Sequence, residues 1–153
     1  MHVISFGGRP ELPSHVTDLA EAAEARAGDL RATEDVKGGL RRDDLLAALA
    51  PVVRASGLTV TERESFAARE VDAVDATDAV ALSVQAGRAR TNNGGLLAVL
   101  AAAAMDDVSW LLLLLPQHYK NSVAAQPVTD DLERLARTPG VRLALEAVVV
   151  ITY

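Results

Sequence analysis

Residues 71–88 read VDAVDATDAVALSVQAGR, and this stretch sets the fold class of the chain. Apolar and polar character alternates from residue 79 to residue 85. One face carries Val80, Leu82 and Val84, and the other carries Ala81, Ser83 and Gln85. A period of two is the spacing of a β-strand, and residues 75–78 have the composition of a tight turn. The stretch therefore predicts a strand that follows a tight turn, as in an antiparallel hairpin.

Two further segments extend this hairpin toward the N-terminus. Residues 58–61 favour a strand, and residues 66–74 are a mixed strand candidate. Together with residues 79–85 they predict an antiparallel meander of three strands.

Helices are predicted before the meander. Residues 2–13 contain several glycines and prolines and indicate an irregular entry segment, while residues 16–27 have apolar positions at helical spacing. A second helix carries leucines and valines on one side. Capping and breaking residues set the expected limits: Ser14 and Gly28 for the first helix, Asp43 or Asp44 and a kink or split at Pro51 for the second.

After the meander, helical and strand patterns alternate. Residues 91–105 predict a helix capped by Thr91, Asn92 or Asn93, and residues 128–136 predict an amphipathic one. Residues 108–115 and 147–153 are continuous apolar runs, typical of strands covered on both faces. The prediction is a single α/β domain, residues 1–153, with an α-β-β-β-α-β core and a mixed sheet flanked by helices.

Composition limits the classes of function. The chain has no cysteine, which excludes disulfides and thiolate zinc sites, and its apolar runs, among them residues 110–115, are far shorter than the ~18 residues of a membrane span. No signal peptide is recognised, so we expect a cytoplasmic protein without a membrane role. The formal net charge of -6 opposes unselective binding of nucleic acid but permits a local basic groove.

The two halves of the hairpin, Val71-Asp72-Ala73-Val74 and Val80-Ala81-Leu82-Ser83-Val84-Gln85-Ala86-Gly87-Arg88, carry a family resemblance. They resemble the metal-site hairpin of the PD-(D/E)XK nuclease superfamily, especially the BglII-like group of type II restriction endonucleases. The likeness covers about half the chain, from Glu70 onward, and the order of predicted elements agrees with it.

The resemblance implies a site for Mg²⁺ and for phosphodiester cleavage. Asp72 takes the position of the first metal-binding acid and Gln85 that of the residue that positions the attacking water, whereas Ser83 stands where the second acid belongs. A neutral hydroxyl supplies no negative charge to Mg²⁺, so we expect weak or absent metal binding. The choice of first acid stays open among Asp72, Asp75 and Asp78. A relocated second acid has three candidates, Glu21, Glu24 and Glu34.

Basic and amide side chains near the hairpin are the candidate nucleic-acid contacts: Arg88, Arg90, Asn92 and Lys120, with Tyr119 and Asn121 beside the last. Arg41 and Arg42 belong to a separate stretch. The preferred hypothesis is a nuclease-like protein that binds nucleic acid, with DNA expected, and has lost or weakened its cleavage activity. The alternatives are an active Mg²⁺-dependent endodeoxyribonuclease and a non-enzymatic interaction protein. A homodimer is a further expectation, with the sheet edge near residues 147–153 as its candidate contact.

Overall fold

The computed structural model describes residues 1–7, 11–35, 39–62, 69–87, 92–120 and 122–153. Within these residues a six-stranded mixed sheet has the order β1-β8-β5-β4-β3-β2. Its strands are β1 (His2–Ser5), β2 (Thr59–Val60), β3 (Ala73–Asp75), β4 (Val80–Val84), β5 (Trp110–Leu115) and β8 (Ala147–Thr152). The neighbours β4, β5 and β8 run parallel, and the other pairs are antiparallel. The predicted α/β class with a mixed sheet is confirmed.

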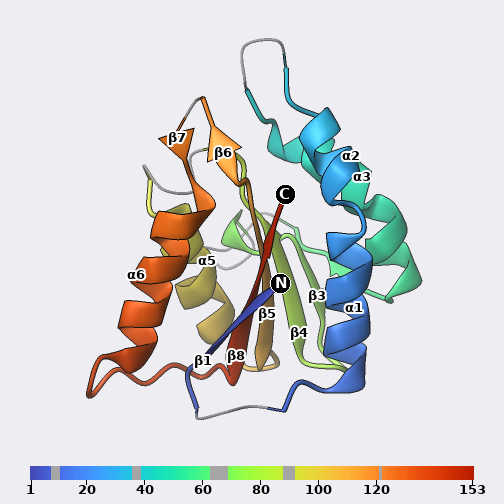
Figure 1. The fold of residues 1–153 in the computed structure, drawn as a ribbon. Coiled ribbons are helices and arrows are strands. Elements are labelled where there is room, and N and C mark those ends of the chain that lie inside the picture. Colours follow the sequence, from blue (N-terminus) through green and yellow to red (C-terminus); the bar gives the residue numbers. More distant parts are fainter. Residues whose placement is uncertain (8–10, 36–38, 63–68, 88–91, 121) are drawn as a thin grey trace.

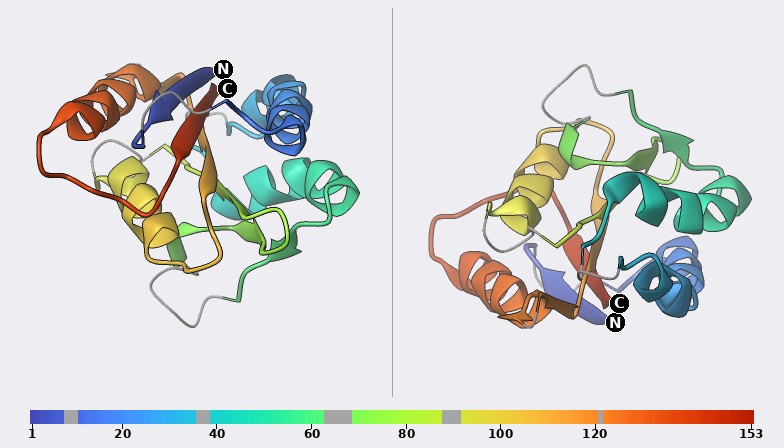
Figure 2. Two further views of the ribbon diagram at one scale, coloured as in Figure 1. Left: turned by 90° about the horizontal axis from the view of Figure 1, so that it is seen from below. Right: turned by 90° about the horizontal axis from the view of Figure 1, so that it is seen from above.

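Helices cover both faces of this sheet (Figure 1). One face is covered by α1 (Ser14–Glu24), α2 (Ala27–Ala32) and α3 (Arg42–Ala55), and the other by α5 (Gly94–Ala103) and α6 (Ala125–Arg137). The views along the strands in Figure 2 show the sheet between these two layers. A small hairpin of β6 (His118–Tyr119) and β7 (Ser122–Val123) follows β5.

The core consists of two apolar clusters, one on each face, and β5 shows why. Its alternate residues Leu112 and Leu114 belong to the cluster under α1 to α3, while residues 111, 113 and 115 belong to the cluster under α5 and α6. All five are fully buried. The continuous leucine run therefore forms a strand covered on both faces, as its sequence predicted.

Several N-terminal expectations were wrong. The segment predicted as irregular contains β1, which pairs with β8. Ser14 is the first helical residue rather than a cap, and Gly28 lies inside α2 instead of ending a helix. Pro51 does not split α3, which continues through it to Ala55. The proline is exposed, so its ring leaves the packed face intact, and burial of Val52 and Val53 offsets the missing backbone hydrogen bond.

Other differences concern the meander and the sheet edge. Residues 69–70 are helical, so β3 is shorter than the predicted strand 66–74, of which residues 66–68 lie outside the described part. β8 pairs with β5 on one side and β1 on the other, so it is not the edge strand expected as a dimer contact. No helix in the described ranges is long and apolar enough to cross a membrane.

Candidate functional site

A cavity of about 590 Å³ opens where β4 ends. Open α/β sheets bind their ligands at the carboxyl ends of parallel strands, and this cavity occupies that position. We call it the strand-end cavity. It is lined by Leu40, Arg42, Glu70, Val84, Gln85, Ala86, Gly87, Asn92, Gly94, Leu97 and Tyr119.

Asp72, the expected metal-binding acid, lies behind one wall of this cavity. Its side chain is 1% exposed, and its Oδ1 accepts a hydrogen bond from Nε of Arg42 at 2.6 Å. Its Oδ2 accepts a second hydrogen bond from the backbone N–H of Val84 at 2.7 Å. Both carboxylate oxygens are therefore engaged, and the negative charge faces a guanidinium.

A β-bulge turns Asp72 toward α3. The ladder pairs Ala73 with Leu82, yet the N–H of Asp72 also donates to the carbonyl of Leu82, at 2.8 Å. Two consecutive residues thus oppose one residue of β4, which interrupts the alternation of faces along the chain. This local geometry directs the Asp72 carboxylate to Arg42, the first residue of α3.

Ser83 and Gln85 come together on the other face of β4. Val80, Leu82 and Val84 contact the cluster under α1 to α3, so the alternating Ser83 faces the α5 side. Its Oγ donates to the carbonyl of Glu70 at 2.7 Å and accepts from Nε2 of Gln85 at 2.9 Å. The two-residue spacing thus makes a direct contact, but the strand separates this pair from the Asp72 carboxylate.

Tyr153 contacts the end of β4 from the α3 side of the sheet. Its hydroxyl donates to the backbone carbonyl of Gln85 at 2.5 Å. Burial raises the pKa of the Tyr153 hydroxyl well above its usual value, and the negative charge of Asp72 raises it further. The hydroxyl therefore stays protonated and fixes the backbone where β4 ends.

These residues do not fit Mg²⁺. The ion prefers several anionic oxygens in octahedral arrangement, whereas Asp72 faces a guanidinium and Ser83 offers a neutral hydroxyl that is already hydrogen-bonded. Among the described residues, no group of three or more histidine, aspartate or glutamate side chains is arranged to hold a metal ion.

In comparisons with protein families, curated proteins and solved structures, the chain matches none.

Of the expected nucleic-acid contacts, Asn92 lines the strand-end cavity, whereas Lys120 does not line it but directly follows the lining residue Tyr119. The Lys120 amine is 5.4 Å from the ring centre of Tyr119. That ring lies directly against the backbone of Gly87, where an added Cβ would meet the ring at 1.7 Å. Arg88, Arg90 and Asn121 lie outside the described residues.

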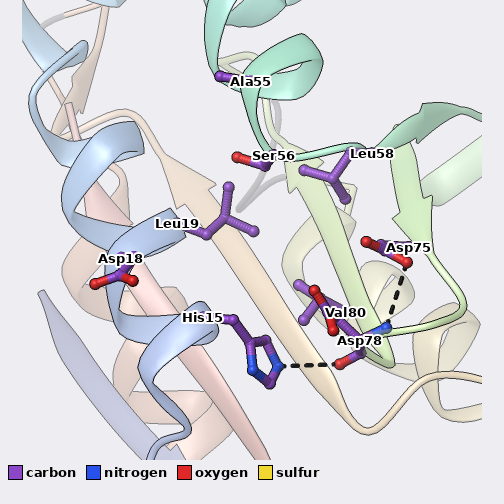
Figure 3. Close-up of a pocket in the computed structure, with 9 residues that line it drawn as sticks. All are labelled: His15, Asp18, Leu19, Ala55, Ser56, Leu58, Asp75, Asp78 and Val80. Atoms are coloured by element: carbon purple, nitrogen blue, oxygen red, sulfur yellow. Dashed lines mark hydrogen bonds between the residues drawn. The ribbon is translucent and has the colours of Figure 1, made fainter.

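The other candidate acids do not line this cavity. Glu21, Glu24 and Glu34 are exposed on or after α1 and α2, and none of them lines it. Asp75 and Asp78 line a different cavity of about 290 Å³ beside the β3–β4 turn (Figure 3).

In that second cavity, Asp75 stabilises the turn that precedes β4. Its Oδ1 accepts the backbone N–H groups of Thr77 and Asp78, at 2.8 and 3.3 Å. His15 forms a hydrogen bond with the backbone carbonyl of Asp78 (Figure 3). The Asp75 carboxylate therefore has a local structural role. Neither Asp75 nor Asp78 lines the strand-end cavity, so Asp72 stays the candidate first acid beside that cavity.

Arg42 and Glu70 are the charged residues that sequence reasoning missed at this cavity. The sequence places Arg42 in a separate basic stretch, because it lies 30 residues before Asp72. Glu70 directly precedes Val71, outside the motif positions. Tyr153 was expected only as the end of an apolar strand. No sequence signal connects these three residues, because their meeting depends on how α3 and β8 pack on the sheet.

Proposed function

We propose that the chain is a nucleic-acid-binding protein with a nuclease-like fold in which metal-dependent cleavage is lost or strongly weakened. The strand-end cavity is the proposed binding site, and DNA is the expected ligand.

The arrangement of elements supports this proposal. The run α3-β2-β3-β4-α5-β5 has the α-β-β-β-α-β order implied by the sequence resemblance. In it, β2, β3 and β4 form an antiparallel meander, and β5 lies parallel to β4 after the α5 crossover. The hairpin that carries Asp72, Ser83 and Gln85 ends at the strand-end cavity.

The Arg42–Asp72 ion pair is the observation that carries the proposed loss of cleavage. A divalent cation at this place needs more negative charge than one carboxylate provides, and here that carboxylate is already neutralised by Arg42. Ser83 contributes no compensating charge. Binding without a metal-activated water is therefore the function that these residues favour.

The test combines binding and cleavage on the full chain. We expect a fluorescein-labelled duplex DNA of mixed sequence to bind, with an affinity that falls as salt rises. We expect no cleavage of supercoiled plasmid DNA with Mg²⁺ or Mn²⁺. Cleavage that is abolished by Asp72→Ala would overturn the proposal. Absence of binding at 50 mM salt to DNA and to RNA of the same sequence would instead favour the interaction protein.

One observation favours the active alternative as a second candidate. Glu70 lines the strand-end cavity, and its backbone carbonyl accepts the Ser83 hydroxyl, so its carboxylate is a candidate replacement for the missing second acid. Calorimetric titration with Mn²⁺ separates the two candidates. The preferred proposal expects no saturable binding, while the active alternative expects binding that Glu70→Gln removes.

A further inference from the structure

The Arg42 guanidinium is held in place by protein groups on one side and reaches the strand-end cavity with the other. Its Nε donates to Asp72, and its Nη1 donates to the backbone carbonyl of Arg69. In the described part of the chain, its Nη2 donates to no other residue. The side chain is 27% exposed and lines the cavity.

This support lowers the entropic cost of binding a ligand. A long arginine side chain normally loses much rotamer freedom when it binds, whereas here the buried Asp72 already orders it. Asp72 is itself fixed by the N–H of Val84. The remaining donors of the guanidinium form a planar edge that suits the paired oxygens of a phosphate.

The first turn of α5 lies on the same cavity. Asn92 and Gly94 line it, and the first N–H group of α5 that bonds backward within the helix is that of Leu97, to Asn93. The amides of Gly94, Gly95 and Leu96 therefore have no acceptor within the helix, as at any helix start. No side chain caps this end, because Asn93 adopts the left-handed conformation and makes no capping hydrogen bond.

From these placements we infer that Arg42, presented by Asp72, binds a phosphate group in the strand-end cavity together with the start of α5. The guanidinium supplies the positive charge that a metal ion supplies in a nuclease, so binding needs no metal. This inference rests on the proposed function and names the part of the nucleic acid that the site contacts. Glu70 is the one acid among the described lining residues, so its charge opposes the phosphate.

The direct test is an NMR titration of the ¹⁵N-labelled full chain with inorganic phosphate. We expect saturable shifts at the amides of Gly94, Gly95 and Leu96. Arg42→Gln should weaken this binding about tenfold, the loss of one charged hydrogen-bonded contact. Glu70→Gln should strengthen it about twofold, because a repelling charge is removed. Shifts that are absent, or identical in Arg42→Gln, would overturn the inference.

Two further variants keep the result interpretable. Arg42→Gln leaves the buried Asp72 carboxylate without its guanidinium and should therefore also lower the stability of the fold. The double variant Arg42→Gln/Asp72→Asn removes both charges. It should recover the stability lost in Arg42→Gln but should not recover phosphate binding. Arg54→Gln is the matched control, because Arg54 is exposed at the far end of α3, about 18 Å along the helix at about 1.5 Å per residue. It should leave the titration unchanged.

The oligonucleotide measurement separates this inference from the proposed function. If DNA binds, Arg42→Gln should reduce the slope of log affinity against log salt by about one. An unchanged slope would refute the role of Arg42 and leave nucleic-acid binding standing. Phosphate binding at α5 without any binding of DNA or RNA would refute the proposed function and leave the anion site standing.

Discussion

Replacing Asp72 with alanine should destabilise the protein by about 3 kcal/mol. The N–H of Val84 is buried and loses its acceptor, which costs about 1–3 kcal/mol. Arg42 loses the carboxylate that neutralises it. Breaking a fully buried pair costs about 3–5 kcal/mol, but Arg42 is 27% exposed and can recover part of its hydration, so we assign about 1 kcal/mol to this loss. For a chain of this length the sum lowers the melting temperature by about 9 °C.

Urea unfolding followed by the fluorescence of Trp110, the single tryptophan, measures this loss. Asp131→Ala is the control, because Asp131 is 76% exposed and 3.9 Å from Arg134, so it should cost less than about 0.5 kcal/mol. The double variant Arg42→Met/Asp72→Ala should cost at least about 1 kcal/mol less than the sum of its single changes. Additive costs, or an Asp72→Ala midpoint equal to wild type, would refute the coupling of the two residues.

Four further variants test the helix packing, the buried tyrosine and the central strand. Gly95→Ala should cost about 1–3 kcal/mol, because its Cβ would lie 2.4 Å from Cγ1 of Val128, while Gly28→Ala, with open space around it, should be neutral or stabilising by up to about 1 kcal/mol in thermal melts. Because the pKa of the Tyr153 hydroxyl is raised in the folded state, the folded protein keeps a proton that the unfolded chain releases above about pH 10. Above that pH the free energy of unfolding should therefore fall by about 1.4 kcal/mol per pH unit. Urea melts at pH 9 to 11 should show that Tyr153→Phe lacks this contribution to the fall in stability. Ser83→Glu buries a charge at a fully enclosed position and should cost at least about 3 kcal/mol, with no rise in melting temperature on adding Mn²⁺; a saturable rise would show that a metal site had formed.

The central strands could be predicted because their signals are local. Alternation identifies β4, and the leucine run identifies β5, since burial on one or both faces leaves a direct trace in the sequence. The edge strand β1 has only four residues beside a glycine- and proline-rich segment, so its pattern was too short to detect. Pro51 does not split α3, because the unfavourable helix propensity of proline is weaker than the burial of the residues that follow it.

The only contact in the candidate site that could be predicted from the sequence is one between residues close together on the same strand. Ser83 and Gln85 are two residues apart on one strand, so their contact follows from the strand period. The direction of the Asp72 side chain depends on a β-bulge that no pattern in the sequence predicts. Its partner Arg42 comes from a helix 30 residues earlier, and only the packing of α3 on the sheet brings them together.

Charge balance links the serine at position 83 to the arginine at position 42. Two carboxylates and a divalent cation sum to zero charge, and so do one carboxylate and one guanidinium. A buried hairpin end tolerates either set but not a mixture, because an uncompensated buried charge costs several kcal/mol. With Arg42 bound to Asp72, an acid at position 83 would leave a net negative charge, and a metal ion at Asp72 would have to displace the guanidinium. Restoring a metal site therefore requires an acid on the α3 side of β4 as well as the release of Asp72 from Arg42. Because Ser83 faces the α5 side, Ser83→Glu/Arg42→Met should still show no saturable Mn²⁺ binding in calorimetry, and saturable binding would refute this placement of the two side chains.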